Sequence, residues 1–250
     1  LDHSLSLYIL KACINLSLLH PARLLHDQLI RHGISIDGLV GNSLITLYAR
    51  CGSLDEGQKI FDLLQNRSSV SWSALIGGYV QHGHGHKAIE IFYEMQYKGL
   101  CLNRSILLSI LKACGIVGDV NKGSEMHAMI EIEGLLESNP IVVSTLVDTY
   151  VKCGSLTRAQ EVFDKLLIRD TISWNALIAG YAEHGHTKEA LRCFEEMQFE
   201  GLMPDAIAMT CVLKACACIG ATFKGQQIYN NIANTLGTSS CFYNQVWLMK

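Results

Sequence analysis

Ten cysteines and ten histidines are the residue types in this 250-residue chain that could bind a metal or act in catalysis. Histidines alternate with glycine at His82, His84 and His86, and again at His184 and His186, but no cluster of thiolates or carboxylates accompanies them. The H-x-E and C-x-x-C patterns of zinc deaminases do not occur in these residues, nor does a nucleophile elbow or a phosphate-binding loop. The sequence therefore predicts no metal, no cofactor and no enzymatic activity for this stretch, and places the histidines in surface turns.

The cysteines recur at fixed places instead of forming a disulfide framework. Cys13, Cys114 and Cys216 each end a Leu-Lys-Ala-Cys tetrad, whereas Cys51 and Cys153 each precede Gly-Ser. Cysteine behaves as a small apolar side chain when it is buried, and a recurring position is typical of packing. We therefore expect reduced cysteines that pack between helices.

The elements that carry these residues come from an internal repeat. The segment 71–100 returns at 173–202 with an offset of 102 residues, and the same offset carries 48–62 onto 150–164. A fixed period of this kind is the signature of a repeat array, in which stacked units present an extended binding surface. The long period contains three units.

Each unit is predicted to form two helices. The second helix shows apolar residues at i, i+3, i+4 and i+7, opened by a small residue that would allow close approach to the first helix. This stripe appears as Gly57, Ile60, Phe61, Leu64; Ala88, Ile91, Phe92, Met95; Gly123, Met126, His127, Ile130; Ala159, Val162, Phe163, Leu166; Ala190, Cys193, Phe194, Met197; and Gly225, Ile228, Tyr229, Ile232. Ser53 and Glu56 are predicted to form a capping box, and Pro204 to lie in a loop between units. The predicted fold class is all-α, a solenoid of helix-turn-helix repeats.

Composition agrees with such an array. Hydrophobic residues make up 49% of the chain and mean hydropathy is +0.22, yet no apolar stretch is long enough to span a membrane. The net charge of −3 gives no overall basic footprint for nucleic acid, so such binding would need a local explanation. No secretory signal is visible, and because Leu1 lies inside a repeat, we expect the natural amino terminus to be missing.

The repeated motifs resemble those of one family. They are SWSALIGGY at 71–79 and SWNALIAGY at 173–181, YARCGSL at 48–54 and YVKCGSL at 150–156, and the three LKAC tetrads. These motifs resemble the pentatricopeptide repeat proteins, in particular the land-plant PLS subclass with alternating P, L and S units. The resemblance implies a right-handed superhelix, and it divides one array over 1–250 into L at 3–37, S at 38–68, P at 69–103, L at 104–139, S at 140–170, P at 171–205 and L at 206–240, with a divergent tail at 238–250.

Function in the resembled family is recognition of one RNA nucleotide per repeat, by the fifth residue of the first helix and the last residue of the unit. The resemblance assigns these roles to four pairs, with the base that each implies: Asn42 with Ser68 for cytosine, Ser73 with Asn103 for adenine, Ser144 with Asp170 for guanine, and Asn175 with Asp205 for uracil. Leu7 and Leu108 at the fifth position of L units offer no hydrogen-bonding group. The predicted ligand is single-stranded RNA of the form 5′-N-C-A-N-G-U-N-3′.

Hydrogen-bond chemistry agrees with this assignment. Uracil and guanine present a ring N–H that the carboxylate of Asp170 or Asp205 can accept, whereas adenine and cytosine present a lone pair that Ser68 or Asn103 can meet with a donor. A short serine at the fifth position leaves room for a purine, and the longer asparagine reaches a pyrimidine. The alternative for each of these residues is a simple helix cap or a solvated position.

The resemblance also implies stacking and phosphate contacts. Leu39, Val70, Ile141 and Ile172 at the second position would wedge between bases, with ordinary hairpin packing as the alternative. Arg50 and Lys152 in the S units would contact phosphate, while Gln81 and Glu183 in the P units would not. About two phosphate contacts predict that log affinity falls only about 1.4 per log unit of salt.

The predicted function is that of a specificity factor in organellar RNA metabolism, most often C-to-U editing in mitochondria or chloroplasts. The implied partners are single-stranded RNA, accessory editing factors that bind L units, and a deaminase carried downstream or supplied in trans. A tetratricopeptide-like scaffold for peptides and a truncated, non-functional array are the alternatives.

Overall fold

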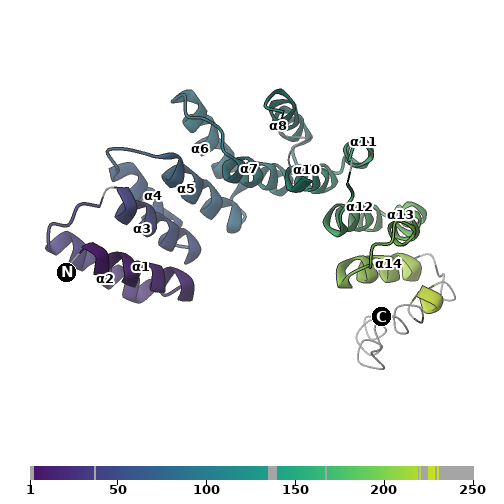
Figure 1. Ribbon diagram of the computed structural model, residues 1–250, viewed down its shortest axis with the longest axis horizontal. Coiled ribbons are helices and arrows are strands. Elements are labelled where there is room, and N and C mark those ends of the chain that lie inside the picture. The colour runs from purple at the N-terminus through teal and green to yellow at the C-terminus, as the bar shows by residue number, and fades with distance from the viewer. Residues whose placement is uncertain are drawn as a thin grey trace. The chain divides into compact units, whose positions relative to one another are not determined.

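The computed structural model describes residues 3–36, 38–134, 140–166, 168–218, 220, 225–228 and 230. Over these residues the secondary structure is α-helical, with no β-strand, which confirms the predicted all-α class (Figure 1). The helices are α1 (His3–Leu16), α2 (Leu19–Arg31), α3 (Gly38–Arg50), α4 (Leu54–Leu63), α5 (Ser69–Gln81), α6 (Gly85–Tyr97), α7 (Arg104–Val117), α8 (Val120–Ile132), α10 (Pro140–Lys152), α11 (Leu156–Asp164), α12 (Thr171–Glu183), α13 (Thr187–Phe199) and α14 (Ala206–Cys218). The predicted tail at 238–250 lies outside the described residues.

The chain divides into two compact units, Leu1–Cys153 and Gly154–Lys250. In the first unit, α1, α3, α5, α7 and α10 each contact the next helix of that series, and α2, α4, α6 and α8 each pack between two of them. In the second unit, α12 contacts α14, α13 packs against both, and α11 contacts α12. We call α1, α3, α5, α7, α10, α12 and α14 the first helices and the others the second helices.

Every first helix begins where the sequence predicts a repeat unit to begin. These residues are His3, Gly38, Ser69, Arg104, Pro140, Thr171 and Ala206. The division into L, S and P units stays a prediction, but the helix starts give the fifth residue of each unit a constant place on its first helix. Pro204 lies in the loop before α14, as predicted.

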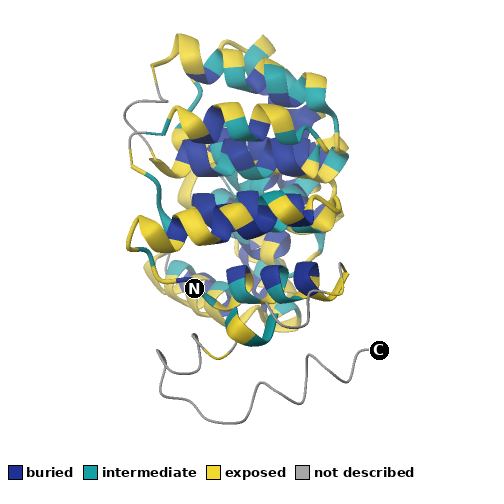
Figure 2. Cartoon of the chain, turned by 90° about the vertical axis from the view of Figure 1, so that its right-hand side faces the viewer, coloured by how far each residue is buried: buried dark blue, intermediate teal, exposed yellow. Residues whose placement is uncertain are grey.

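In the described second helices the predicted apolar stripes are mostly buried, and Figure 2 shows buried residues in dark blue along the helices. Tyr229 and Ile232 of the last predicted stripe lie outside the described residues. Phe61, Phe92, Phe163 and Phe194 are at most 1% exposed, and the small residues Ala88, Ala159 and Ala190 are fully buried. The ring of Trp72 meets Phe61 edge-on at 4.6 Å, and Trp174 meets Phe163 in the same way at 4.5 Å. Because burial of large apolar side chains dominates folding free energy, the stripes explain why each second helix docks.

A glycine on the first helices sets how closely α3 and α5 approach. A Cβ atom on Gly78 would lie only 2.5 Å from the Cβ of Ala49, so no other residue fits without movement. At the neighbouring Gly77, the nearest atom to an added Cβ would be the Ser109 hydroxyl at 4.0 Å. Close packing in α5 therefore depends on Gly78 and not on Gly77.

The turn between α3 and α4 follows the sequence expectation in one respect and departs from it in another. Gly52 has φ of +76°, which glycine adopts without strain. The predicted capping box is wrong, because the Ser53 side chain makes no cap hydrogen bond. Glu56 instead forms an ion pair with Arg23 of α2, so its carboxylate is directed toward another helix.

The candidate chemical residues lie in turns and in the core. His82 and His84 are exposed in the turn before α6, where the Nδ1 atom of His82 lies 3.0 Å from the Gly78 carbonyl oxygen. Cys13, Cys114 and Cys216 are buried, as expected of packing residues, and burial raises the pKa of Cys114 to about 12. Over the described ranges, no group of three His, Cys, Asp or Glu side chains could hold a metal ion, and no helix is long and apolar enough to cross a membrane.

Candidate nucleic-acid interface

The residue that ends each predicted S or P unit is the N-cap of the following first helix. Asn103 Oδ1 accepts from the Ile106 backbone N–H at 2.9 Å, and Asp205 Oδ1 accepts from Ile207 and Ala208 at 2.9 and 3.1 Å. Asp170 forms a reciprocal capping box with Ser173, and Ser68 accepts from Ser71 at 3.4 Å. The capping role, considered as an alternative to base recognition, is therefore present in all four residues. Capping also holds each side chain in one orientation.

Hydrogen bonds join the two members of the pairs that contain Asn42, Ser73 and Asn175. The fifth residue of a first helix meets the cap of the next one in these contacts: Asn42 Nδ2 donates to Ser68 Oγ at 3.4 Å, Asn103 Nδ2 donates to Ser73 Oγ at 3.4 Å, and Asn175 Nδ2 donates to Asp205 Oδ2 at 2.7 Å. In the fourth pair, Ser144 belongs to the first compact unit and Asp170 to the second. Ser144 is 3% exposed and its hydroxyl donates to the Pro140 carbonyl.

The Asn175 and Asp205 pair has the shortest contact and a defined polarity. A carboxylate oxygen can only accept, so the amide nitrogen of Asn175 must face Asp205. This orientation leaves Asn175 Oδ1 buried and without a hydrogen-bond partner among the residues the structure describes. A buried acceptor without a partner lowers stability by about 1 to 3 kcal/mol, so this orientation of Asn175 costs folding free energy.

The amide of Asn103 is oriented by the same logic. Its Oδ1 atom is used by the cap, and one N–H of its Nδ2 group is used by Ser73. The second N–H of that amide remains available as a donor. The cap therefore orients the Asn103 amide so that this N–H can be donated to a ligand.

The four predicted stacking residues are exposed aliphatic side chains on the second residue of their helices. Leu39, Val70, Ile141 and Ile172 are 69%, 57%, 49% and 64% exposed, which argues against ordinary hairpin packing as their role. Ile207 at the same place in α14 is 57% exposed and was missed by the sequence reasoning. Ile207 could have been found from the sequence, because it is the second residue of the predicted unit that starts at Ala206.

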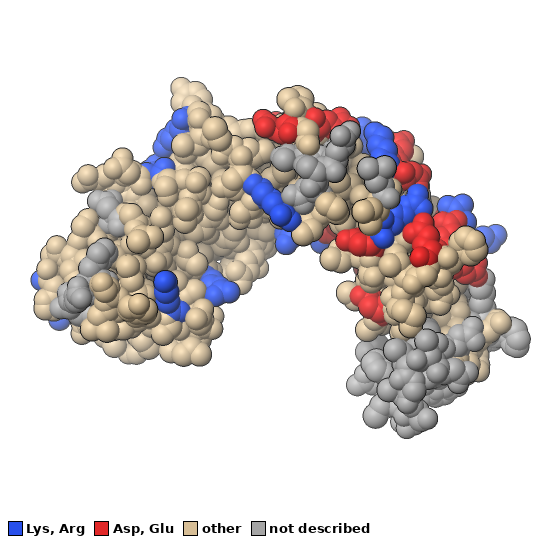
Figure 3. Space-filling model, in the orientation of Figure 1, with Lys and Arg blue, Asp and Glu red and all other residues tan. Residues whose placement is uncertain are grey.

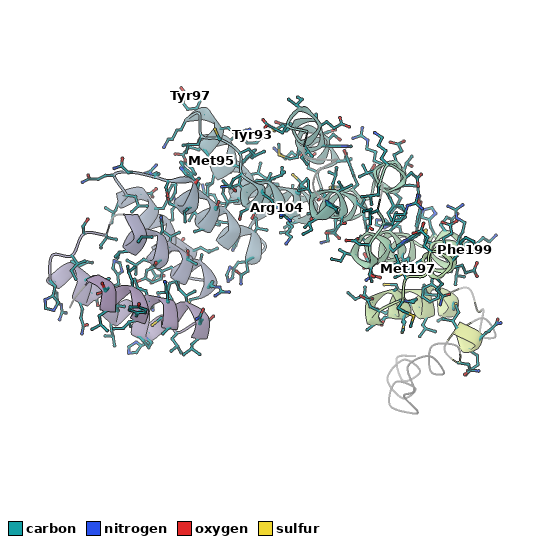
Figure 4. All side chains as sticks on the ribbon, viewed as in Figure 1. Tyr93, Met95, Tyr97, Arg104, Met197 and Phe199 are labelled. Carbon is teal, nitrogen blue, oxygen red and sulfur yellow. The ribbon has the colours of Figure 1, made fainter. Side chains whose placement is uncertain are left out.

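The two predicted phosphate contacts are already engaged within the protein. Lys152 Nζ lies 2.7 Å from Asp148 Oδ2, and Arg50 donates to the Ile14 carbonyl oxygen at 3.3 Å. Arg104 was not predicted, yet it is exposed at the start of α7, directly after Asn103 (Figure 4). A basic residue in the first turn of a helix opposes the helix dipole, so Arg104 has no evident helix-stabilising role.

Charge is divided between the two helix layers. The first helices carry six basic residues against two acidic ones, namely Lys11, Arg50, Arg104, Lys112, Lys152 and Lys214 against Asp148 and Glu183. The described second helices carry eight basic and thirteen acidic residues, and the acidic side chains visible in Figure 3 gather over α8 and around α11 and α13. The excess lies in the first compact unit, whose first helices carry five basic residues against one acidic residue, whereas Lys214 and Glu183 balance in the second unit. The first helices of the first unit therefore supply the local positive charge that nucleic-acid binding would need.

Comparisons with known sequences agree with the repeat motifs. A model of the PPR repeat family matches residues 169–218, and a model of the PPR repeat matches 42–69, 70–100 and 141–170. A pentatricopeptide repeat-containing protein of Arabidopsis thaliana is 38% identical over 92% of this chain and 37% of its own length. A second, named chloroplastic, is 37% identical over 94% of this chain and 38% of its own length, and a further relative is named mitochondrial. The chain thus spans less than two fifths of the first two relatives' own length.

Solved structures give the same result for the fold. The pentatricopeptide repeat protein PPR10, in complex with an 18-nucleotide psaJ RNA element, has a TM-score of 0.72 over 88% of this chain and 33% of its own, at 22% sequence identity. This likeness, together with the helical hairpins, confirms the helical-repeat architecture. The chain belongs to the pentatricopeptide repeat family.

Proposed function

We propose that this chain binds single-stranded RNA in a sequence-specific manner, with one nucleotide recognised by each repeat. The observation that carries the proposal is the hydrogen bond between the fifth residue and the following cap in the pairs that contain Asn42, Ser73 and Asn175. Family membership and the RNA named with PPR10 support the ligand class.

Two of the hydrogen-bonded pairs leave a group that can bind a base: an acceptor on Asp205 and a donor on Asn103. Asp205 Oδ1 accepts the backbone N–H groups of the cap, and Oδ2 accepts from Asn175 Nδ2. The second lone pair of Oδ2 can accept the ring N–H of uracil. The free N–H of Asn103 can donate to the ring nitrogen of adenine, beside the short side chain of Ser73. These groups, with Asn42 and Ser68 for cytosine and Ser144 and Asp170 for guanine, give the ligand 5′-N-C-A-N-G-U-N-3′.

The role that follows is that of a specificity factor in organellar RNA metabolism, most often for C-to-U editing. The PLS unit pattern in the sequence supports editing, and relatives named chloroplastic and mitochondrial support an organelle. The deaminase would lie in another part of the protein or come from a partner, and accessory editing factors would bind the L units.

Binding to synthetic RNAs tests the proposal. The purified chain should bind the heptamer above at least tenfold more tightly than RNAs of the same composition in which C, A, G and U are permuted. Equal affinity for all permutations would overturn base recognition by these pairs. Absence of RNA binding, with affinity for peptides, would favour a peptide-binding scaffold instead.

A further inference from the structure

The predicted L units share a lysine and have no serine or asparagine at the fifth position. Their fifth residues are Leu7 and Leu108, which have no hydrogen-bonding side chain, and Thr210, whose hydroxyl donates to the Ala206 carbonyl oxygen at 2.7 Å. Four residues after each of these comes the lysine of an LKAC tetrad, namely Lys11, Lys112 and Lys214. We call these three the L-unit lysines.

The L-unit lysines lie on the helix face that carries the proposed recognition residues. Residues at i, i+3 and i+7 share one face of a helix, so the second, fifth and ninth residues of a first helix form one row. The ninth residue is lysine in the L units and Gly77 or Ala179 in the P units. A lysine at the ninth position starts about 6 Å along the helix axis from the fifth, a distance that suits the backbone of a strand whose base is read at the fifth.

The charge of the L-unit lysines is not neutralised within the protein. All three side chains are exposed, and no carboxylate of the described residues lies within 4.0 Å of their Nζ atoms. The lysine on the first helix α10 differs, since Lys152 is paired with Asp148. Lys87 of α6 is likewise paired with Glu90, and Lys98, directly after α6, is paired with Glu94.

We propose that the L-unit lysines bind the phosphodiester backbone of the RNA, so that L units anchor the strand while S and P units read its bases. This inference rests on the proposed function, and it moves the main phosphate contacts from Arg50 and Lys152 to Lys11, Lys112 and Lys214. Contacts to phosphate carry no sequence information and act on all RNAs alike. Three such contacts contribute about 2 to the slope of log affinity against log salt concentration, at about 0.7 per contact for a single strand.

The salt dependence of RNA binding tests the proposal. Affinity for 5′-N-C-A-N-G-U-N-3′ is measured from 50 to 300 mM salt for the wild-type chain and for the triple variant Lys11→Gln, Lys112→Gln, Lys214→Gln. The slope should fall by about 2 in the triple variant, with the preference among permuted RNAs unchanged. The matched control Lys59→Gln, Lys87→Gln, Lys188→Gln removes the same charge from α4, α6 and α13 and should retain the wild-type slope to within about 0.5.

A second triple variant, with arginine at the three positions, keeps the charge and should restore the slope, which separates charge from damage to the fold. An unchanged slope in the glutamine variant, or an equal loss in the second-helix control, would overturn the anchoring role while leaving base recognition intact. If the wild-type chain binds no RNA at all, the proposed function fails, and the anchoring role fails with it.

Discussion

At the scale of single residues, the hydrogen-bonded pairs connect fold and recognition. Because the predicted reading residue that ends each S or P unit is also an N-cap, its side chain is fixed before a ligand arrives. Asparagine and aspartate cap a helix about equally well, so one can replace the other with little cost to stability. The identity of the cap can therefore change base preference almost independently of folding.

Asp205→Asn should convert the uracil position to cytosine. An asparagine at 205 would cap α14 through its oxygen, as Asn103 caps α7, and would present an N–H where the carboxylate presented a lone pair. We expect the ratio of affinities for cytosine and uracil at that one base to change by about tenfold or more, because exchanging an acceptor for a donor is worth about 1.4 kcal/mol. Competition between RNAs that differ only there measures it, and a retained uracil preference with normal melting would contradict the assignment.

The indole N–H of Trp72 has lost the partner that its counterpart Trp174 keeps, because one residue differs between the two repeat copies. Trp174 Nε1 donates to Glu200 at 3.1 Å, but the corresponding residue beside Trp72 is Lys98, and Trp72 Nε1 has no acceptor among the described residues. Lys98→Gln should supply that acceptor and raise the free energy of unfolding by about 1 kcal/mol. Urea denaturation measures the change. A loss of stability would show that the contact of Lys98 with the Trp72 ring and Glu94 matters more.

At the scale of helices, close packing between successive first helices depends on single small residues. Gly78→Ala should lower the free energy of unfolding by about 1 to 3 kcal/mol, because its new Cβ would overlap Ala49. Gly77→Ala is the matched control on the same helix, where the added Cβ has space. It should raise stability by about 0.5 to 1 kcal/mol through helix propensity alone. Equal effects of the two substitutions would contradict the packing described for α3 and α5.

The contact between α2 and α3 includes a half-buried histidine, His26. His26 Nδ1 lies 2.8 Å from the Tyr48 hydroxyl, and burial lowers the pKa of His26, with Asp27 and Glu56 opposing the shift in part. A histidine with a lowered pKa binds a proton less well in the folded state than in the unfolded state. Its contribution to stability is therefore lost as pH falls below about 6.5, the ordinary pKa of histidine.

His26→Gln should consequently lose less stability between pH 7 and pH 5 than the wild-type chain does. Thermal or urea unfolding at several pH values measures this difference. The exposed His86→Gln, outside the contact between α2 and α3, is the matched control for replacing a histidine with glutamine. Parallel curves for wild type and His26→Gln would show that this contact does not respond to protonation.

At the scale of the whole molecule, the sequence predicted what depends on local patterns and missed what depends on distant partners. The stripe around Phe92 follows from residue spacing within one unit, and the structure buries Ala88, Ile91, Phe92 and Met95 as expected. The capping box at Ser53 failed because Glu56 pairs with Arg23, 33 residues away. Arg50 likewise contacts a carbonyl oxygen of α1, which periodicity alone cannot reveal.

Net charge was also a poor guide to where charge lies. The total of −3 conceals an excess of basic residues on the first helices and of acidic residues on the second helices. This division could have been read from the sequence once the helix layers were assigned, because it requires only the order of elements. A ligand with a negative backbone should consequently be drawn to the first helices of the unit Leu1–Cys153, even though the whole chain is acidic.

Selection from a randomised pool of single-stranded RNA at moderate salt tests the central claim most directly. The bound fraction of the purified chain is sequenced, with the Asp205→Asn variant selected in parallel. Enrichment of C-A-N-G-U by the wild type, and of C-A-N-G-C by the variant, is the predicted result. Identical enrichment by the two proteins, or a pool without any base preference, would contradict recognition of one nucleotide per repeat by these residues.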